Sequence, residues 1–260
     1  MNLPIVKYPP ATLQEALTTA NKLQPLERLE NIIRSVISKS DDHTSLVIQI
    51  ASMVGAEILF GLRERGSELN SVELARQFNT SRTPAREAIY ILEKEGLVEM
   101  PPRRRPRVIV LSLEEIKELY GVRAAIAGIV AAEAVAKATD EELEGIRQFI
   151  PQIERASANA DVEVYYWLNV SFQEYMTKLA HNATLQRILE TLVLRSLLLK
   201  RLVLSQPGRL ATSARGHIYL AEAILNRDRE LAAALAKSNV LDGCKIFVQY
   251  FLAENPRPTD

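Results

Sequence analysis

The sequence predicts a mainly α-helical protein: an N-terminal winged helix-turn-helix (helices plus a small β-hairpin wing), followed by an all-α antiparallel bundle of six helices. Ala and Leu are abundant, aromatic residues make up 6% of the chain and glycines number 10, which favours helices over sheets. The β-prone runs lie within residues 97–111, around a tip rich in Pro and Arg. After residue 111, apolar residues recur at helical spacing and no convincing strand follows.

The composition is that of a soluble globular protein with a core, since 47% of residues are hydrophobic and 25% charged. A length of 260 residues suffices for two domains. The formal net charge is zero, so nucleic-acid binding would have to rest on a local basic patch.

The single cysteine, Cys244, excludes an intramolecular disulfide and is consistent with a reducing cytoplasm. Its apolar surroundings favour a buried thiol over a reactive one. No secretory signal is visible, and the best membrane candidate, residues 46–62, is too short and is interrupted by Gln49 and Glu57. We therefore expect a cytoplasmic protein with no membrane partner.

Residues 1–43 are predicted to be a helical extension, on the strength of apolar residues at helical spacing between 26 and 37. The favoured interpretation is an arm that packs on its own or a partner subunit; the alternative is an added regulatory element.

Residues 44–111 are predicted to form the winged helix-turn-helix. A first helix over 44–64 is expected to end at Gly66, and Ser71 is expected to cap a short second helix. The link Asn79-Thr80 then leads to a third helix. Two short helices joined by a tight link are the helix-turn-helix pattern, and the first helix supports them from behind.

The third helix begins at residues 81–84. Ser81 or Thr83 can cap it, and Pro84 suits a first-turn position where no donor is needed. Its apolar face is predicted to consist of Ala85, Ala88, Ile89 and Leu92, with Gly96 as the C-terminal stop. Arg82, Thr83 and Arg86 lie clear of that face, so this basic N-terminus suits a DNA major groove.

Two β-prone runs, 97–100 and 107–111, are predicted to pair as a hairpin that makes the helix-turn-helix winged. From residue 82 to residue 107 there are seven basic and four acidic residues. The wing arginines are Arg103, Arg104, Arg105 and Arg107. A solvated charged face is the ordinary interpretation of such a run, but beside a recognition helix we favour phosphate or minor-groove contact.

Residues 112–254 are predicted to form the helical bundle, and 255–260 a tail. Ser112 and Glu115 make a capping box, and Thr139 with Glu142 repeats it. The expected helices are 113–138, 140–157, 161–181, 183–205, 209–226 and 228–252.

These motifs resemble a known family. Residues 81–88 read Ser-Arg-Thr-Pro-Ala-Arg-Glu-Ala and residues 92–98 read Leu-Glu-Lys-Glu-Gly-Leu-Val, which is similar to the winged-helix signature of GntR-type bacterial transcription regulators. The run Leu-Tyr-Gly-Val-Arg at 119–123, His181-Asn182 before a leucine-rich helix, and His217 eleven residues before Asp228 resemble the FadR-like subfamily, whose all-helical effector domain is called FCD.

The resemblance covers about 44–250 and implies DNA contacts from Ser81, Arg82, Thr83, Arg86 and the wing. At the wing tip the family's usual glycine is Pro106 here. Proline cannot take a positive φ, so the turn must differ.

The resemblance also bears on metal binding. Many FCD domains hold a divalent metal through an Asp and a His four residues apart on one helix, plus one His from each of two later helices. The matching positions here are Asn169, Gln173, His217 and Asn239. Amides are poor ligands for a transition metal and one imidazole cannot hold zinc alone, so we expect no bound transition metal and no cofactor.

Arg123 matches a basic position of the first bundle helix that, in the family, can meet an acidic effector. Together Arg123, Asn169, Gln173, His217 and Asn239 are expected to make a polar, mildly cationic effector site for a small organic acid, bound without metal. The alternative is a set of buried amides that satisfy one another in a domain that only dimerises.

The sequence thus predicts a ligand-responsive, sequence-specific DNA-binding transcription regulator, a repressor, acting as a homodimer on a palindromic double-stranded operator in the nucleoid. The alternative is a constitutive or architectural DNA-binding protein. An enzyme is not expected, because no nucleophile elbow, phosphate loop or carboxylate pair accompanies His217.

Overall fold

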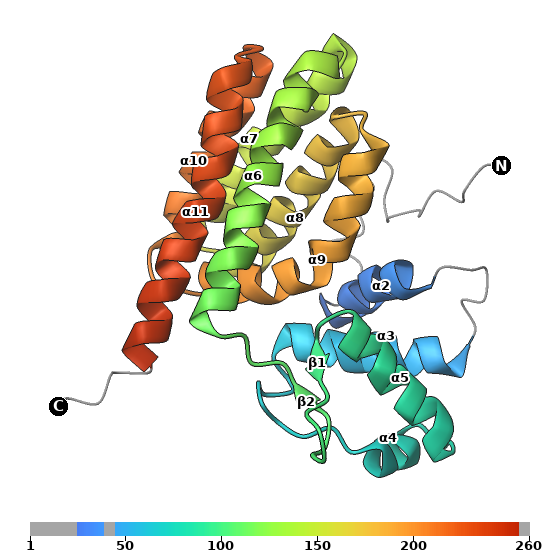
Figure 1. Ribbon diagram of the computed structural model, residues 1–260. Coiled ribbons are helices and arrows are strands. Elements are labelled where there is room, and N and C mark those ends of the chain that lie inside the picture. Colours follow the sequence, from blue (N-terminus) through green and yellow to red (C-terminus); the bar gives the residue numbers. More distant parts are fainter. Residues whose placement is uncertain (1–24, 39–44, 255–260) are drawn as a thin grey trace. The chain divides into compact units, whose positions relative to one another are not determined.

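The computed structural model describes residues 25–38 and 45–254. The predicted extension 1–43 is therefore described only over 25–38, and the predicted tail 255–260 lies outside the described residues. Within them the chain forms ten helices and one two-stranded sheet, which confirms the predicted fold class (Figure 1). The chain divides into two compact units. One runs to Val110 and includes Glu190–Leu198, and the other is Leu111–Leu189 with residues from Leu199 onward.

The first unit contains α2 (Pro25–Ile37), α3 (Leu46–Phe60), α4 (Ser71–Gln77) and α5 (Arg82–Lys94). Helix α2 packs along α3, and both α3 and α4 pack against α5. Gly55 lets three helices meet closely, because a Cβ there would lie 2.9 Å from Ile33 Cδ1 of α2 and 3.1 Å from Leu92 Cδ2 of α5. Ile33 and Leu92 are fully buried at this junction.

Two predicted helix signals in this unit were wrong by a few residues. Helix α3 ends at Phe60 because Gly61, at φ +90°, takes the left-handed conformation that stops it, well before Gly66. Helix α4 is capped by Asn70 and not by Ser71: the Val72 N–H donates to Asn70 Oδ1 at 2.9 Å. The physical reason is that Asn70 takes the extended N-cap backbone (φ −104°, ψ 112°) and its side chain accepts a first-turn N–H, so the helix already begins at Ser71.

The wing is shorter than predicted. Strands β1 (Val98–Glu99) and β2 (Arg107–Val108) pair antiparallel, with Val98 opposite Val108. A third segment supports the hairpin from outside: Leu69 N–H donates to the Pro106 carbonyl at 2.7 Å, and Val108 N–H donates to the Ser67 carbonyl at 2.9 Å. The prolines at the two ends of the tip, Pro101, Pro102 and Pro106, restrict strand pairing to the base of the hairpin.

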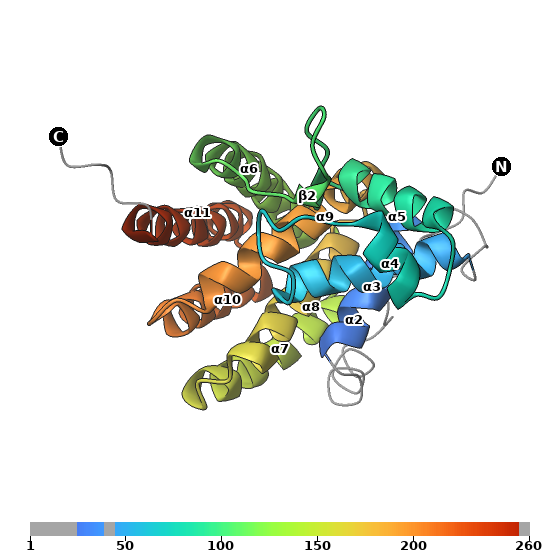
Figure 2. The same cartoon turned by 90° about the horizontal axis from the view of Figure 1, so that it is seen from below.

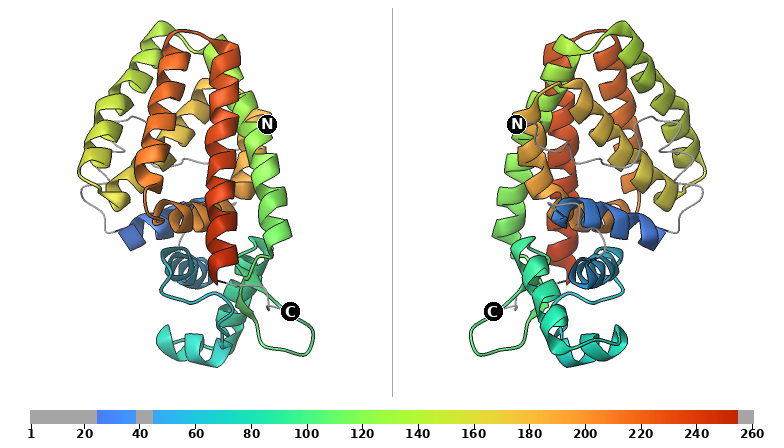
Figure 3. Two further views of the ribbon diagram at one scale, coloured as in Figure 1. Left: turned by 90° about the vertical axis from the view of Figure 1, so that its left-hand side faces the viewer. Right: turned by 90° about the vertical axis from the view of Figure 1, so that its right-hand side faces the viewer.

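The six predicted bundle helices belong to the second unit, apart from Glu190–Leu198 of α9. They are α6 (Leu113–Lys137), α7 (Asp140–Ala158), α8 (Val162–Leu179), α9 (Ala183–Leu204), α10 (Arg209–Leu225) and α11 (Arg229–Glu254). Five of them close a ring of neighbours in the order α6, α11, α10, α7, α8 and back to α6. Figure 2 shows this ring from one end, and Figure 3 shows the short turns that reverse the chain between α6 and α7 and between α10 and α11.

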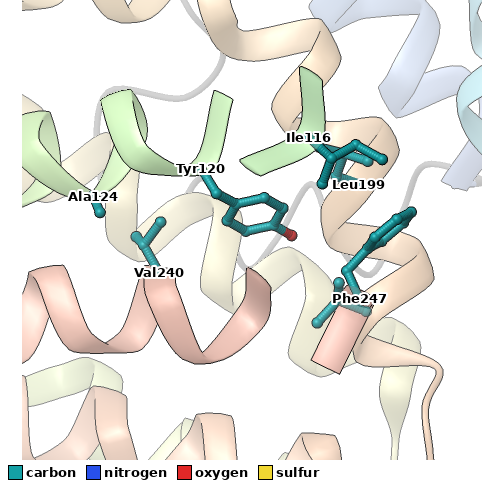
Figure 4. Packing of buried hydrophobic residues seen from close by; sticks show 7 residues of the cluster. Ile116, Tyr120, Ala124, Leu199, Val240 and Phe247 are labelled. Carbon is teal, nitrogen blue, oxygen red and sulfur yellow. The ribbon is translucent and has the colours of Figure 1, made fainter. Parts of the chain in front are cut away.

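The ring is held by an apolar core and by the predicted caps. In Figure 4 the Tyr120 ring of α6 lies between α6 and α11, close to Val240 and Phe247, with Leu199 of α9 on the same cluster. Both capping boxes form, at Ser112 with Glu115 and at Thr139 with Glu142. Helix α6 is long and apolar enough to cross a membrane by length and composition. In this structure it is a core helix of the bundle, packed against α11 and α8.

Candidate functional site

The exposed face of α5 carries the predicted DNA-contacting residues. Its buried face consists of Ala85, Ala88, Ile89 and Leu92, as the periodicity predicts. On the opposite side Ser81, Arg82, Thr83 and Arg86 are all exposed. Because the apolar face anchors the helix, these four polar side chains are held at one end of it and open to a ligand.

The start of α5 lacks its predicted side-chain cap. Ser81 is the N-cap residue, with extended backbone (φ −80°, ψ 169°), but its side chain accepts no backbone N–H. The first-turn donors are therefore not satisfied by a Ser81 or Thr83 cap, and the helix dipole adds partial positive charge there. Such a terminus is a suitable contact for a DNA phosphate.

Tyr90 is a surface residue of α5 that the sequence reasoning did not single out. Its side chain is 47% exposed, and its hydroxyl accepts a long hydrogen bond, 3.5 Å, from an Arg86 terminal nitrogen. The spacing of four residues places both on one helix face. Tyr90 therefore restricts the directions that the Arg86 side chain can take.

The four wing arginines divide into two pairs. Arg107 donates from Nε to Glu99 across the hairpin at 2.6 Å, and Arg105 pairs with Glu68 at 2.9 Å. Arg103 and Arg104 are exposed at the tip, and the ion pairs found in the described residues do not include them. The charge available to a phosphate backbone is therefore concentrated at Arg103 and Arg104.

The positive φ that Pro106 cannot take occurs at another position of the wing turn. Arg103 takes the left-handed conformation, at φ +59°, and Arg104 N–H donates to the Pro101 carbonyl at 3.2 Å. Pro106 keeps the negative φ that its ring imposes, and its carbonyl accepts a hydrogen bond from the Leu69 N–H. The reversal occurs three residues before the proline, and it presents Arg103 to solvent.

In the second unit, His217 of α10 is the centre of a buried hydrogen-bond network. Its Nδ1 lies 2.8 Å from the Ser213 carbonyl, which can only accept, so Nδ1 carries the proton. Its Nε2 then accepts from the Asn169 amide nitrogen at 3.2 Å. Tyr165 completes the network by donating its hydroxyl to Ser213 Oγ at 2.9 Å. Burial first, and then the nearby Lys200 and Arg209 charges, lower the His217 pKa to about 4, so the imidazole is neutral at pH 7.

This network does not fit a transition metal. The Nε2 lone pair that would bind a metal is engaged by Asn169, and Gln173 Oε1 accepts from Lys200 Nζ at 2.9 Å. In the described part of the chain, no group of three or more His, Cys, Asp or Glu side chains could hold a metal ion. The four positions that match the family's metal ligands thus carry three amides and one imidazole, which does not match a zinc or iron site.

The structure brings together only part of the predicted effector set. Asn169 and His217 touch, whereas Gln173 contacts Lys200, and Asn239 lies directly against the Gly216 backbone. Arg123 stacks over the Tyr120 ring, 5.0 Å from its centroid. These side chains come from α6, α8, α10 and α11 of the ring.

Two buried cations were missed by the sequence reasoning. Lys200 of α9 is 9% exposed and Arg209 of α10 is 6% exposed. Burial, with a contribution from Arg123 opposed by Glu174, lowers the Lys200 pKa to about 7. Burial also lowers the Arg209 pKa below its usual value. A basic residue directly after a run of leucines, as in Leu-Leu-Leu-Lys at 197–200, was the available signal for Lys200.

Comparison with known families agrees with both units. Residues 46–108 match the model of bacterial regulatory proteins of the gntR family, and residues 118–241 match the FCD domain. The chain belongs to the GntR family and carries an FCD domain. The helix-turn-helix and wing described above fall in the first match, and the His217 network falls in the second. The family is one of DNA-binding transcription regulators, so this GntR protein is a non-enzymatic regulator.

Relatives of this GntR protein are named as transcription regulators or repressors. The HTH-type transcriptional regulator YdhC of Bacillus subtilis is 28% identical over 75% of this chain and 87% of its own. The gluconate operon transcriptional repressor of Bacillus licheniformis is 26% identical over 58% of this chain and 64% of its own. Among solved structures, Escherichia coli McbR/YncC superposes with a TM-score of 0.65 at 20% identity, covering 80% of this chain and 99% of that one. At this identity, the similarity to McbR/YncC shows a shared fold only.

Proposed function

We propose that this GntR protein is a repressor that binds a palindromic operator in the nucleoid as a homodimer and is released by a small organic acid held in the FCD domain without a metal. The observation that carries the DNA half of the proposal is the exposed, uncapped N-terminus of α5 with Arg82 and Arg86 beside it. Helix N-termini and arginines of this kind read guanine edges and grip phosphates.

The wing supports the same proposal. Arg103 and Arg104 project from its tip, whereas Arg105 and Arg107 are engaged with Glu68 and Glu99. We therefore assign the direct contact with the DNA backbone or minor groove to Arg103 and Arg104. Arg105 and Arg107 stabilise the conformation of the wing through their ion pairs, and they contribute to DNA binding mainly by holding Arg103 and Arg104 in place.

Homodimerisation is supported by an exposed apolar stripe on α6. Val122 is 52% exposed and Ile129 is 49% exposed, and the exposed Gly121 and Ala125 lie beside them at helical spacing. A second copy of the chain fits this stripe, because small and apolar residues allow two helices to approach closely and a two-fold dimer matches a palindrome. The gluconate operon repressor, a named repressor among the relatives, supports repression over activation.

The effector half rests on the cations of the bundle interior. Arg123, Lys200 and Arg209 are buried there with the amide of Asn169, and the half-buried Gln173 contacts Lys200. An organic acid would supply the missing negative charge without a metal. A constitutive DNA-binding protein is the second candidate, because His217, Asn169, Tyr165 and Ser213 already satisfy much of one another's hydrogen bonding.

Operator binding tests the first half. We expect Arg82→Ala and Arg86→Ala each to weaken binding to the specific operator by about 1–3 kcal/mol, measured by fluorescence anisotropy at fixed salt. Glu87→Ala, at a neighbouring exposed position of α5, is the matched control and should keep its affinity. If a folded Arg82→Ala/Arg86→Ala variant binds the operator as the wild type does, α5 is not the reading element.

Thermal unfolding tests the effector half. A saturable rise in Tm with small carboxylates, together with release of the operator at the same concentrations, is the expected outcome. If no small molecule changes either the Tm or the operator affinity, the result contradicts the ligand-responsive repressor and supports the constitutive DNA-binding protein.

A further inference from the structure

We propose that Arg123, Lys200 and Arg209 form one anion site inside the bundle that takes a small ligand with two negative charges, a dicarboxylate or a phosphate monoester. The inference rests on the proposed function in that this dianion would be the effector. The inference goes beyond the proposed function in two ways. It assigns Lys200 and Arg209, which the sequence did not predict, as ligand-binding groups, and it excludes monoanions and neutral molecules as ligands of the site.

The three cations act as one cluster. They come from α6, α9 and α10, and each is at most 9% exposed. The charge of Arg123 acts on Lys200, and the charges of Lys200 and Arg209 both act on His217. Tyr120 links two of them, since Arg123 stacks over its ring and both arginines act on its hydroxyl. Three like charges within mutual range in a buried site repel one another unless a counter-charge is present.

The protein supplies only part of that counter-charge. Glu174 attracts Lys200, and Asp242 attracts Arg209. Asp242 forms its ion pair elsewhere, with Lys245 at 2.9 Å. The ion pairs recorded among the described residues include neither Arg123, Lys200 nor Arg209. A bound anion would complete the charge balance.

Hydrogen-bond donors in the same region also lack acceptors. Arg209 Nε and Asn239 Nδ2 are buried and have no partner within the described part of the chain. Arg209 does use one terminal nitrogen, which donates to the Asn239 carbonyl at 3.3 Å. Buried donors without acceptors are costly, so an incoming group rich in acceptor oxygens would be favoured at this point. Carboxylates and phosphates are such groups.

Lys200 explains why a second negative charge is selected. One of the three N–H groups of its ammonium donates to Gln173 Oε1, and the other two can donate to a ligand. The groups that face it are Arg123 on α6, Glu174 and Gln173 on α8, and His217 on α10. With a pKa of about 7 it is only partly charged in the empty site, whereas a dianion beside it would raise that pKa. Binding of a dianion should therefore take up a proton.

Calorimetric titration of the full-length protein tests the site with matched probes. Succinate and glycerol 3-phosphate represent the two sources of a dianion, and succinamate is the monoanion of nearly the same shape as succinate. We expect at least one dianion to bind saturably and at least about tenfold more tightly than succinamate. Succinate binding should weaken by at least about fivefold between pH 6.5 and pH 8.5, because Lys200 loses its proton over that range.

Variants separate the site from general charge effects. Lys200→Met, which keeps the length of the side chain, should weaken dianion binding at least about tenfold and remove the pH dependence. Lys237→Met, an exposed lysine of α11, is the control and should change neither. Because Lys200→Met removes a buried charge, its Tm without ligand should be unchanged or higher, which excludes misfolding as the cause.

Three results would overturn the anion site: neither dianion binds, succinamate binds as tightly as succinate, or Lys200→Met binds dianions like the wild type. None of these results touches the DNA half of the proposed function. Release of the operator by a neutral sugar or a monoanion, but by neither dianion, would leave the protein a ligand-responsive regulator and contradict the dianion as its effector. Conversely, dianion binding that leaves the operator affinity unchanged would support the site and contradict its role as the switch.

Discussion

His217 is held neutral by residues on two helices of the bundle. Nδ1 donates to the Ser213 carbonyl within α10, and Nε2 accepts from Asn169 of α8. The aromatic rings of Phe172 and Tyr165 stand edge-on to the imidazole, at centroid distances of 5.5 and 6.3 Å. In these surroundings a second proton has no acceptor and no solvent, so the charged form is strongly disfavoured.

The sign of the resulting pH dependence follows from the two pKa values. The unfolded-state value is near 6.5 and the folded-state value is about 4, so between them only the unfolded chain takes up the proton. The contribution of His217 is therefore constant above pH 6.5 and is lost as pH falls toward 4, by on the order of 3 kcal/mol in total.

Urea unfolding of wild type and His217→Gln at several pH values checks this prediction. The stability of the wild type should fall more steeply than that of His217→Gln between pH 6.5 and pH 4, and the two should run parallel above pH 7. Parallel curves through the whole acid range would mean that His217 is protonated in the folded protein or is reached by solvent.

Single residues also mark the limit of what the sequence could predict at the candidate site. The resemblance to FCD domains singled out Asn169 and His217, and they meet in the structure. Lys200 and Arg201 are adjacent in a leucine-rich stretch of α9, and sequence alone does not say which one faces the interior. In the structure Lys200 is buried, and Arg201 pairs with Glu163 at 2.6 Å. That difference of one position depends on the rotation of α9, which tertiary packing sets.

Helix α2 is the part of the predicted extension 1–43 that the structure describes, and it packs on α3 of its own chain. It lies outside the range matched by the GntR model, which begins at residue 46, yet its Leu29, Ile32 and Ile33 are at most 2% exposed. These residues pack on α3, whose composition is apolar around most of its circumference. A helix with so little polar surface needs cover on more than one side, and α2 provides it.

A double-mutant cycle tests this packing. Ile33→Ala should destabilise the protein by about 2–5 kcal/mol, as a large-to-small change in a core does. Gly55→Ala alone gains helix propensity but meets Ile33 Cδ1, so the two effects oppose each other. In the Ile33→Ala background only the 3.1 Å approach to Leu92 Cδ2 remains, so the change in stability caused by Gly55→Ala should be more favourable there than in the wild type, by up to about 1 kcal/mol.

Denaturant unfolding of the four proteins gives the coupling directly. A coupling energy near zero would show that α2 does not lie on Gly55, and hence that it is not part of the winged-helix unit's core. Gly61→Ala is a separate control, because the strain at φ +90° should destabilise that variant whether or not α2 is in place.

The turns of the same unit show why some boundaries could not be predicted. Gly96 stops α5 as expected: at φ +72° it donates its N–H to the Glu93 carbonyl, and Leu97 N–H donates to the Leu92 carbonyl, as in a Schellman motif. In the wing, by contrast, an arginine and not a glycine takes the left-handed position. The pairing of segment 66–69 with β2 holds that turn, and pairing between segments distant in sequence leaves no local signal.

At the scale of the whole molecule, regulation requires the FCD domain to favour one arrangement of two DNA-binding units over another. An effector can do so only if it binds the two arrangements unequally, and the gain in operator affinity from pairing two units sets the size of the possible effect. The proposed dimer is thus the element on which both halves of the function depend. The exposed α6 stripe of Gly121, Val122, Ala125 and Ile129 is where it can be broken without touching either site.

We expect Val122→Lys/Ile129→Lys to convert the protein to a monomer of about 29 kDa, because charges placed at the centre of an apolar interface cannot be solvated there. Analytical ultracentrifugation would measure the mass, and anisotropy with the full operator should show a loss of affinity of at least about a hundredfold, since the second half-site no longer binds as part of the same particle. Binding to an isolated half-site should change little, because α5 and the wing are intact.

Leu231→Lys, at a position of α11 that is 48% exposed, is the matched control and should remain a dimer. A double variant that still sediments at twice the chain mass would place the interface on another face of the bundle.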